Sequence, residues 1–238
     1  MERKSSQGVA EHGWGTGGFD RIALLGERYG GGHNERYHGF LLRQLRGRFG
    51  EALEIGCGTG AFSRALAARS EHVLAIDLSP EMIRVARERS SGCGNVDFEV
   101  GDALEWEFSK ERFECIASIA TLHHLPMERM LMKMKAALKA GGTLMVLDLY
   151  KARDPLDFLV SAAAVPVDLG LRLAGGRLVA PREVREAWEE HGRHDTYLTL
   201  WEVRRICARV LPGAGVRRHL LWRYSVVWRK GPAADDGR

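Results

Sequence analysis

The chain has 238 residues, 45% hydrophobic and 28% charged, and its 35 Lys and Arg exceed its 31 Asp and Glu to leave a net charge of +4. This composition excludes an intrinsically disordered chain, a collagen-like chain and a disulfide-stapled miniprotein. The most apolar stretch is residues 156–174. Asp157, Asp168 and Arg172 interrupt it, so no segment has the roughly 18 uninterrupted apolar residues of a membrane span.

The cysteines and the N-terminus indicate the compartment. Four cysteines are scattered through the sequence with no C-x-x-C pair, which fits neither a zinc cluster nor a disulfide framework. Residues 1–10 carry charges with no apolar run behind them, so they lack the form of a secretory signal. We therefore expect a cytoplasmic protein. The small positive excess makes nucleic acid a minor alternative rather than the expected partner.

From about residue 51, short apolar runs alternate with helical patterns. The predicted strands are 52–55, 72–76, 96–100, 113–119 and 143–149, and the predicted helices are 62–69, 80–89 and 127–139. Gly141 and Gly142 are expected to end the last of these helices. Alternation of this kind predicts a parallel sheet covered by helices on both faces.

The alternation breaks after residue 150. Residues 155–173 and 181–191 have helical patterns with no strand between them, which indicates an insertion. A helix at 200–210 follows, and then strands at 216–222 and 225–229 with Arg223 and Tyr224 as the only turn residues. This spacing predicts an antiparallel hairpin at the end of the sheet.

We expect one large domain with an insertion. The predicted parts are a disordered tail (1–15), an N-terminal helical cap (16–50), a core (51–150), a helical insertion acting as a substrate lid (151–195), a helix and hairpin completing the core (196–230) and a disordered tail (231–238).

Three alternate glycines follow the first predicted strand, in the sequence Leu53-Glu54-Ile55-Gly56-Cys57-Gly58-Thr59-Gly60. Glycine tolerates positive φ and lets a ligand lie against the backbone, and the carboxyl end of a strand is where ligand crevices open in such sheets. The loop therefore predicts a cofactor site. Its G-x-G-x-x-A spacing also fits dinucleotide enzymes.

Two acids end neighbouring predicted strands. Asp77 lies nineteen residues after Gly58, where an acid can accept hydrogen bonds from the ribose hydroxyls of an adenosine ligand. Asp102 ends the third strand and would meet an adenine edge on the same rim. The alternatives are a helix N-terminal acid before Ser79 for Asp77 and a solvated turn for Asp102.

Four motifs in order carry a family resemblance: LEIGCGTG, AIDLSPEMI, VGDA and SIATLHHL, between about residues 52 and 150. With them the chain resembles the class I S-adenosylmethionine (SAM) methyltransferases, and most closely the branch similar to ubiquinone and menaquinone biosynthesis methyltransferases. The terminal LLWRYSVVW also looks like the last two strands of that family. The resemblance implies an α/β, Rossmann-like, seven-stranded, mostly parallel sheet with a C-terminal antiparallel hairpin. It also implies SAM as cofactor and S-adenosylhomocysteine (SAH) as product.

The resemblance implies roles for individual residues. Glu54 would lie near the methionine ammonium, Met82 would lie against the adenine ring, and the backbone around Ile119 and Ala120 would approach the methionine portion. The implied cofactor-contacting set is Glu54, Gly56, Cys57, Gly58, Gly60, Asp77, Leu78, Met82, Asp102, Ala103, Ile119 and Ala120. Two positions depart from the family pattern: Glu114 replaces a common Asp, and Tyr29 is followed by glycine rather than Asp.

Methyl transfer is an in-line displacement, so positioning and exclusion of water can supply much of the catalysis and a base is optional. If a base is used, His123 and His124 follow the fourth strand at the pocket edge, and only one of two adjacent residues is expected to face the substrate. The alternative is that one or both of them are hydrogen-bonded to loop backbone. Tyr29 is a further candidate, which packing of the cap explains equally well. No metal site is expected, since Gly192 interrupts the H-x-x-H of His191 and His194.

The predicted acceptor is a small hydrophobic or aromatic metabolite, because residues 156–173 would form an apolar lid. The alternative is that these apolar residues simply pack on the sheet. One alternative is RNA or protein methylation, since residues 181–230 hold eleven Lys and Arg and six Asp and Glu, a balance of +5. Others are a noncatalytic SAM-binding protein and a dehydrogenase. A monomer or homodimer is expected.

Overall fold

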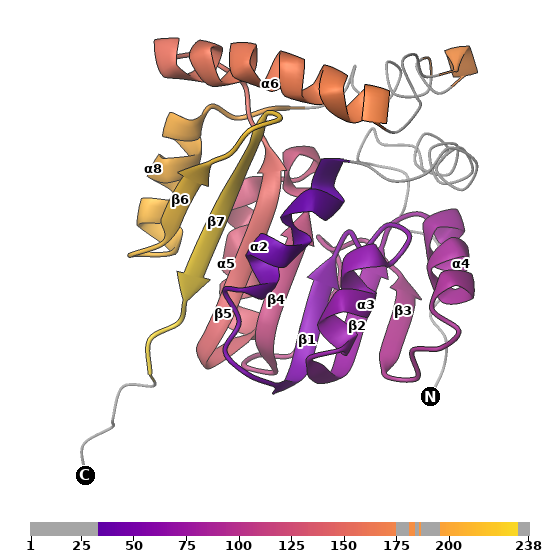
Figure 1. Cartoon of the computed structure of the whole chain (residues 1–238). Coiled ribbons are helices and arrows are strands. Elements are labelled where there is room, and N and C mark those ends of the chain that lie inside the picture. The colour runs from indigo at the N-terminus through magenta and orange to yellow at the C-terminus, as the bar shows by residue number, and fades with distance from the viewer. Residues whose placement is uncertain (1–32, 175–180, 184–185, 187–195, 233–238) are drawn as a thin grey trace.

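The computed structural model describes residues 33–174, 181–183, 186 and 196–232 (Figure 1). A seven-stranded sheet has the order β3-β2-β1-β4-β5-β7-β6. The strands from β1 to β5 are parallel and β7 is antiparallel to both β5 and β6, as predicted. Their bounds are β1 Phe49–Ile55, β2 Ser70–Asp77, β3 Val96–Val100, β4 Phe113–Ile119, β5 Leu138–Leu149, β6 Gly215–Arg218 and β7 Arg223–Arg229.

Helices cover both faces of this sheet. Alternate residues of each strand point to opposite faces, so Leu53 and Ile55 pack in one core cluster with α5 and α8, while Ala52 packs in the other with α2, α3 and α4. The helix bounds are η1 His33–Tyr37, α2 His38–Leu42, α3 Ala61–Ala67, α4 Pro80–Arg89, η2 Leu122–His124, α5 Met127–Ala137, α6 Pro155–Ala174 and α8 Leu200–Val210.

The strand order reverses between β1 and β4, which lie side by side although the chain runs from β1 outward to β3 before returning. Ligands bind at such switch points, beyond the carboxyl ends of the strands. The glycine loop after β1 and the segment after β4 therefore meet at this edge.

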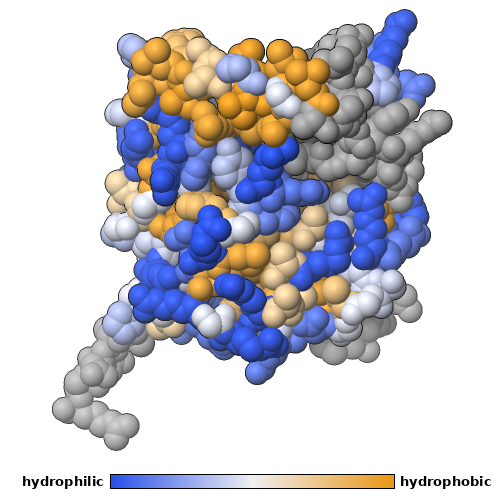
Figure 2. All heavy atoms as spheres, viewed as in Figure 1, coloured by the Kyte–Doolittle hydropathy of each residue, from blue (hydrophilic) through white to orange (hydrophobic). Residues whose placement is uncertain are grey.

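Helix α6 lies across the carboxyl ends of the parallel strands (Figure 1), where the insertion was expected. Its large apolar residues do not cover the strand ends as predicted but face solvent. They form an exposed cap on the molecule, coloured orange at the top of Figure 2. None of the described helices combines the length and the apolar character that a bilayer crossing requires.

The prediction that Gly141 and Gly142 end a helix at Lys139 was wrong. Helix α5 ends at Ala137 and β5 begins at once with Leu138. Both glycines lie within β5, where Gly141 donates to the Lys230 carbonyl at 2.9 Å and the Lys230 N–H donates to Gly142 at 3.0 Å. The register of β5 against β4 shifts at this point, so the glycines accommodate a bulge.

The predicted turn of the hairpin was also wrong. Arg223 and Tyr224 belong to β7, and the connection is formed by residues 219–222. Leu221 and Trp222 adopt positive φ values of 57° and 59°. Bulky residues rarely adopt this conformation, so the sequence carries no turn signal there. Burial of the Leu221 side chain, which is 3% exposed, helps to hold the turn.

Candidate cofactor-binding and catalytic site

Glycine is required for different reasons at the three positions of the loop. All have positive φ, between 51° and 75°. A Cβ on Gly56 would lie 2.0 Å from Thr121 Oγ1, and one on Gly60 would lie 2.8 Å from the Phe98 ring, so packing alone excludes a side chain at both positions. A Cβ on Gly58 would meet only Met82 Sδ, at 4.0 Å. Gly58 is therefore the position where the loop backbone is open to a ligand.

Asp77 connects the glycine loop to α4. Its Oδ2 accepts the Gly58 N–H at 2.8 Å and its Oδ1 accepts the Ser79 N–H at 3.0 Å. Ser79 is the N-cap of α4 and accepts the Met82 N–H at 3.0 Å. The alternative role of Asp77, as an acid at the start of a helix before Ser79, is therefore also observed. Both carboxylate oxygens of Asp77 therefore hold backbone N–H groups, one in the glycine loop and one at the start of α4.

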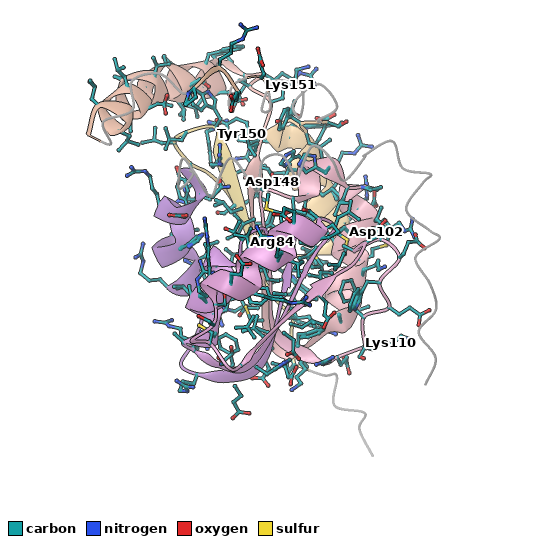
Figure 3. All side chains as sticks on the ribbon, turned by 90° about the vertical axis from the view of Figure 1, so that its right-hand side faces the viewer. Arg84, Asp102, Lys110, Asp148, Tyr150 and Lys151 are labelled. Carbon is teal, nitrogen blue, oxygen red and sulfur yellow. The ribbon has the colours of Figure 1, made fainter. Side chains whose placement is uncertain are left out.

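Asp102 forms the third corner of this rim. Its Oδ1 accepts the Leu104 N–H at 2.8 Å, which fixes the turn after β3 and leaves the half-buried carboxylate at the edge (Figure 3). The neighbouring Ala103 is buried. Leu78 and Met82 are half-buried at the ends of β2 and α4. The adjacent ends of β1, β2 and β3 thus carry the predicted adenosine-contacting residues.

Glu54 is a buried acid under the loop. It is 2% exposed and accepts the Ser63 hydroxyl at 2.5 Å. Burial raises the pKa of this carboxyl to about 8, and the Asp77 charge adds to the increase. Among the described residues no cation forms an ion pair with Glu54. The charge of Arg64 opposes this increase only in part, and an ammonium group would supply a further opposite charge, so Glu54 fits the amino-acid end of SAM.

Cys57 has a packing role in the described structure. It is 6% exposed, and burial raises the pKa of its thiol well above the usual value. Its N–H donates to the Ile76 carbonyl at 3.0 Å, which joins the loop to β2. The side chain is therefore a neutral, small packing group, and any cofactor contact would come from its backbone.

The segment after β4 is held in a strained turn. Ala120 has a φ of 50°, uncommon for a residue other than glycine, and its N–H donates to the Leu147 carbonyl at 2.7 Å. Thr121 Oγ1 donates to Ile119 at 3.0 Å and lies 3.4 Å from the Gly56 carbonyl. The segment after β4 and the glycine loop are therefore in direct contact. Sequence reasoning missed Thr121, although it belongs to the SIATLHHL motif.

His123 is paired with a buried acid that sequence reasoning also missed. The Asp148 carboxylate, from β5, accepts the His123 N–H at 2.9 Å and lies 2.6 Å from the ring Nδ1. Their side chains are 5% and 0% exposed. Figure 3 shows Asp148 below Tyr150, on the path from β5 toward α6. Asp148 favours the tautomer with the proton on Nδ1, which leaves Nε2 as the basic nitrogen.

The two histidines do not point apart, contrary to the prediction. They lie in the short 3₁₀ turn η2 rather than in extended backbone, and their ring centroids are 3.8 Å apart. Tyr197 also stacks on His123, with centroids 5.2 Å apart and planes 23° apart. The His123 ring is thus fixed by an acid and two neighbouring rings.

The third catalytic candidate, Tyr29, lies outside the described residues, as do His191 and His194. Within the described ranges, no three His, Cys, Asp or Glu side chains gather as metal ligands. The described part of the cap contacts the site through Arg223. This 9% exposed residue donates from Nε to Asn34 Oδ1 at 2.8 Å, and the negative charge of Asp148 acts on it.

Comparisons with known proteins identify methyltransferases as similar to this chain. A family model described as a methyltransferase domain matches residues 52–142. An uncharacterized methyltransferase of Mycobacterium tuberculosis is 29% identical over 182 residues, which cover 74% of this chain and 85% of the relative. A ubiquinone biosynthesis O-methyltransferase of Xylella fastidiosa is 40% identical over 98 residues (40% and 39%). A demethylmenaquinone methyltransferase of Clavibacter sepedonicus is 32% identical over 105 residues (44% and 43%).

Solved structures share the fold. A SAM-dependent methyltransferase from Aquifex aeolicus superposes with a TM-score of 0.56 at 18% identity, covering 89% of this chain and 97% of its own. A phosphoethanolamine N-methyltransferase of Haemonchus contortus in complex with SAM gives 0.59 at 18% identity, covering 88% and 44%.

Fold and family match together make this chain a class I SAM-dependent methyltransferase, with SAM as its cofactor. Over less than half of its length the chain is similar to ubiquinone and menaquinone biosynthesis methyltransferases.

Proposed function

We propose that this enzyme methylates a hydroxyl or an acidic carbon of a small hydrophobic or aromatic molecule by in-line displacement, with His123 as the base. The observation that carries the proposal is the buried His123–Asp148 pair, 2.6 Å apart at the carboxyl ends of the strands. Bound SAM supplies an electrophilic methyl group on a sulfonium, which leaves as SAH after transfer. The acceptor oxygen or carbon gains the methyl group and its proton goes to His123 Nε2.

The residues that would hold SAM lie along the ends of β1 to β4. Glu54 would pair with its ammonium, Asp77 would accept from the ribose hydroxyls, and Asp102 would meet the adenine edge with Ala103. Gly58 would admit the cofactor close to the backbone, because its Cβ position is open. Leu78 and Met82 would pack on the adenine ring. The Ile119–Ala120 backbone would line the methionine portion.

Asp148 is proposed as a positioning residue for the base. An Asp that holds Nδ1–H fixes the imidazole orientation and stabilises the imidazolium formed on proton transfer. The neighbouring rings of His124 and Tyr197 would restrict the motion of the His123 ring. In this arrangement His123 is the catalytic residue, and His124 lines the site without taking the proton.

The predicted apolar lid does not support a hydrophobic acceptor, so the support comes from other observations. The apolar residues of α6 are exposed on its outer side, so they do not line the site. An aromatic acceptor is supported instead by the Tyr197 ring stacked beside His123. The names of the partial relatives, a ubiquinone biosynthesis O-methyltransferase and a demethylmenaquinone methyltransferase, point to ring-containing acceptors as well.

The test is transfer from methyl-labelled SAM to a metabolite extract and to a panel of catechols and hydroquinones, after calorimetry has measured SAH and NAD binding. We expect SAH binding, no NAD binding and label in a small molecule. Asp148→Asn should lower kcat by about 10²-fold or more while SAH affinity changes less than threefold. Label in RNA or protein, or an unchanged kcat in Asp148→Asn, would overturn the proposal.

A further inference from the structure

Helix α6 has its polar and apolar sides reversed relative to a helix that packs on a core. Asp157, Ala164 and Asp168 face the body of the protein and are at most 9% exposed. The outer face of α6 consists of seven apolar residues that are 40–67% exposed: Leu156, Phe158, Leu159, Val165, Val167, Leu169 and Leu173. A surface helix normally buries such a stripe. Contiguous exposed apolar surface of this kind marks an interaction site.

Among the side chains of α6 that the structure describes, none on the outer face is charged, and cations border this face at its N-terminal end. Lys151 and Arg153 precede the helix and are exposed. The start of α8 lies beside them, because the Lys151 N–H donates to the Leu198 carbonyl at 2.9 Å. In residues 151–154 and 200–205, four Lys and Arg stand against two acids. This border therefore has an excess of positive charge.

An aromatic residue completes this border. Trp201, in the first turn of α8, is 60% exposed, and the Arg205 guanidinium lies 5.4 Å from the centre of its ring. Tryptophan and arginine side chains are typical of the boundary between lipid headgroups and hydrocarbon. Apolar Leu and Phe on one face, with Trp and basic residues at the rim, are typical of a helix that lies in the plane of a membrane interface.

We propose that the outer face of α6 docks the protein peripherally on an anionic lipid bilayer. The seven apolar side chains enter the headgroup boundary, while Lys151, Arg153 and Arg205 contact lipid phosphates. A bilayer of anionic lipid matches both the apolar face and the positive excess at its border, whereas the same face of a second copy has no excess of acid to pair with those cations. Asp157 and Asp168, on the inner side, keep the helix on the surface rather than across it. The proposal concerns the outer face only and holds whatever the acceptor is.

The orientation follows from the fold. Helix α6 lies across the carboxyl ends of the strands (Figure 1), so docking through its outer face turns the edge that carries His123 and the glycine loop toward the bilayer. The opposite edge of the sheet and the C-terminal end of β7 point toward solvent. The apolar cap in Figure 2 is thus a surface that docking would remove from water.

The experiment is co-sedimentation of the full-length protein with large unilamellar vesicles of phosphatidylcholine alone or with 30% phosphatidylglycerol. We expect at least tenfold tighter binding to the anionic vesicles in low salt, and a large loss in 500 mM salt because screening weakens the phosphate contacts. The double variant Phe158→Glu/Leu159→Glu should reduce binding at least tenfold. Met132→Glu changes an apolar residue that is 51% exposed on α5 and should leave binding unchanged.

Two further measurements keep the outcomes distinct. Circular dichroism melting and SAH calorimetry of the double variant should match the unchanged protein, since the two side chains are exposed; a failure of SAH binding in every protein counts against the cofactor site rather than the docking face. Light scattering reports the oligomeric state. No sedimentation with either vesicle, equal loss of binding in Met132→Glu, or a dimer that Phe158→Glu/Leu159→Glu dissolves would overturn the proposal.

Discussion

Glu54 is a single buried side chain that suits a cationic ligand but lowers the stability of the cofactor-free protein at neutral pH. Its carboxyl is enclosed by β1 and α3 and has the Ser63 hydroxyl as its hydrogen-bond donor. Burial raises its pKa to about 8, so the cofactor-free protein holds a proton there at neutral pH. A ligand ammonium would reverse that preference, because an opposite charge favours the ionised form.

This gives a prediction for Glu54→Gln. Because the folded pKa lies above the value in the unfolded chain, the contribution of Glu54 to stability is complete below about pH 4 and is lost as pH rises through 8. The free energy of unfolding without cofactor should therefore fall between pH 5 and pH 8, by up to about 3 kcal/mol. Glu54→Gln should flatten this slope and weaken SAH binding by about 10–100-fold. Urea unfolding at several pH values and calorimetry measure the two effects.

The control for this prediction is Glu99→Gln, which alters an exposed acid on β3. It should leave both the pH slope and SAH affinity as they were. An unaltered slope in Glu54→Gln would show that another group dominates the pH dependence, and an unaltered SAH affinity would remove Glu54 from the cofactor site.

At the scale of elements, the strands and motifs that depend on local sequence could be predicted. The contacts that depend on pairing between distant segments could not. The apolar runs and the cofactor motifs placed β1 to β4 and the rim acids at the observed edge. Asp148 lies inside a continuous apolar strand, and only the β4–β5 pairing brings it to His123. The sequence also could not predict which face of α6 packs on the protein, because the helix is apolar on most sides. Only the packing places Asp157 and Asp168 on the inner side.

The N-terminus of helix α8 has a capping box whose contribution to stability can be predicted. Thr199 and Glu202 form a capping box, in which the Thr199 N–H donates to Glu202 at 2.8 Å and the Glu202 N–H donates to the Thr199 hydroxyl. Thr199→Ala should lower the free energy of unfolding by about 1 kcal/mol, measured by urea denaturation. The same bonds lower the pKa of Glu202, so the capping contribution should be lost as pH falls through that lowered pKa.

Thr196→Ala is the matched control, since Thr196 is exposed and lies before the helix. It should change stability by less than about 0.5 kcal/mol. Equal effects of the two substitutions would mean that the capping box adds nothing to the stability of the folded chain.

For the molecule as a whole, Arg223 joins parts that are far apart in the sequence. From the first residue of β7 it donates to Asn34 in η1 and to the Leu221 carbonyl, and its charge acts on Asp148. Burial lowers its pKa, while the neighbouring acid opposes that shift. The turn at Leu221, with its positive φ, precedes Arg223 and lets the chain place this cation near Asp148.

Arg223→Met should therefore act on both stability and catalysis. Removing a buried cation leaves the Asp148 charge less compensated, which should cost about 3 kcal/mol of unfolding free energy and lower kcat through a misplaced His123. SAH affinity should hold within threefold, since Arg223 is remote from the glycine loop in the sheet order. Asn34→Ala keeps the cation and should cost only about 1 kcal/mol, with little change in kcat. A kcat in Arg223→Met equal to that of the unchanged enzyme, measured well below its melting temperature, would show that Asp148 positions His123 without the arginine.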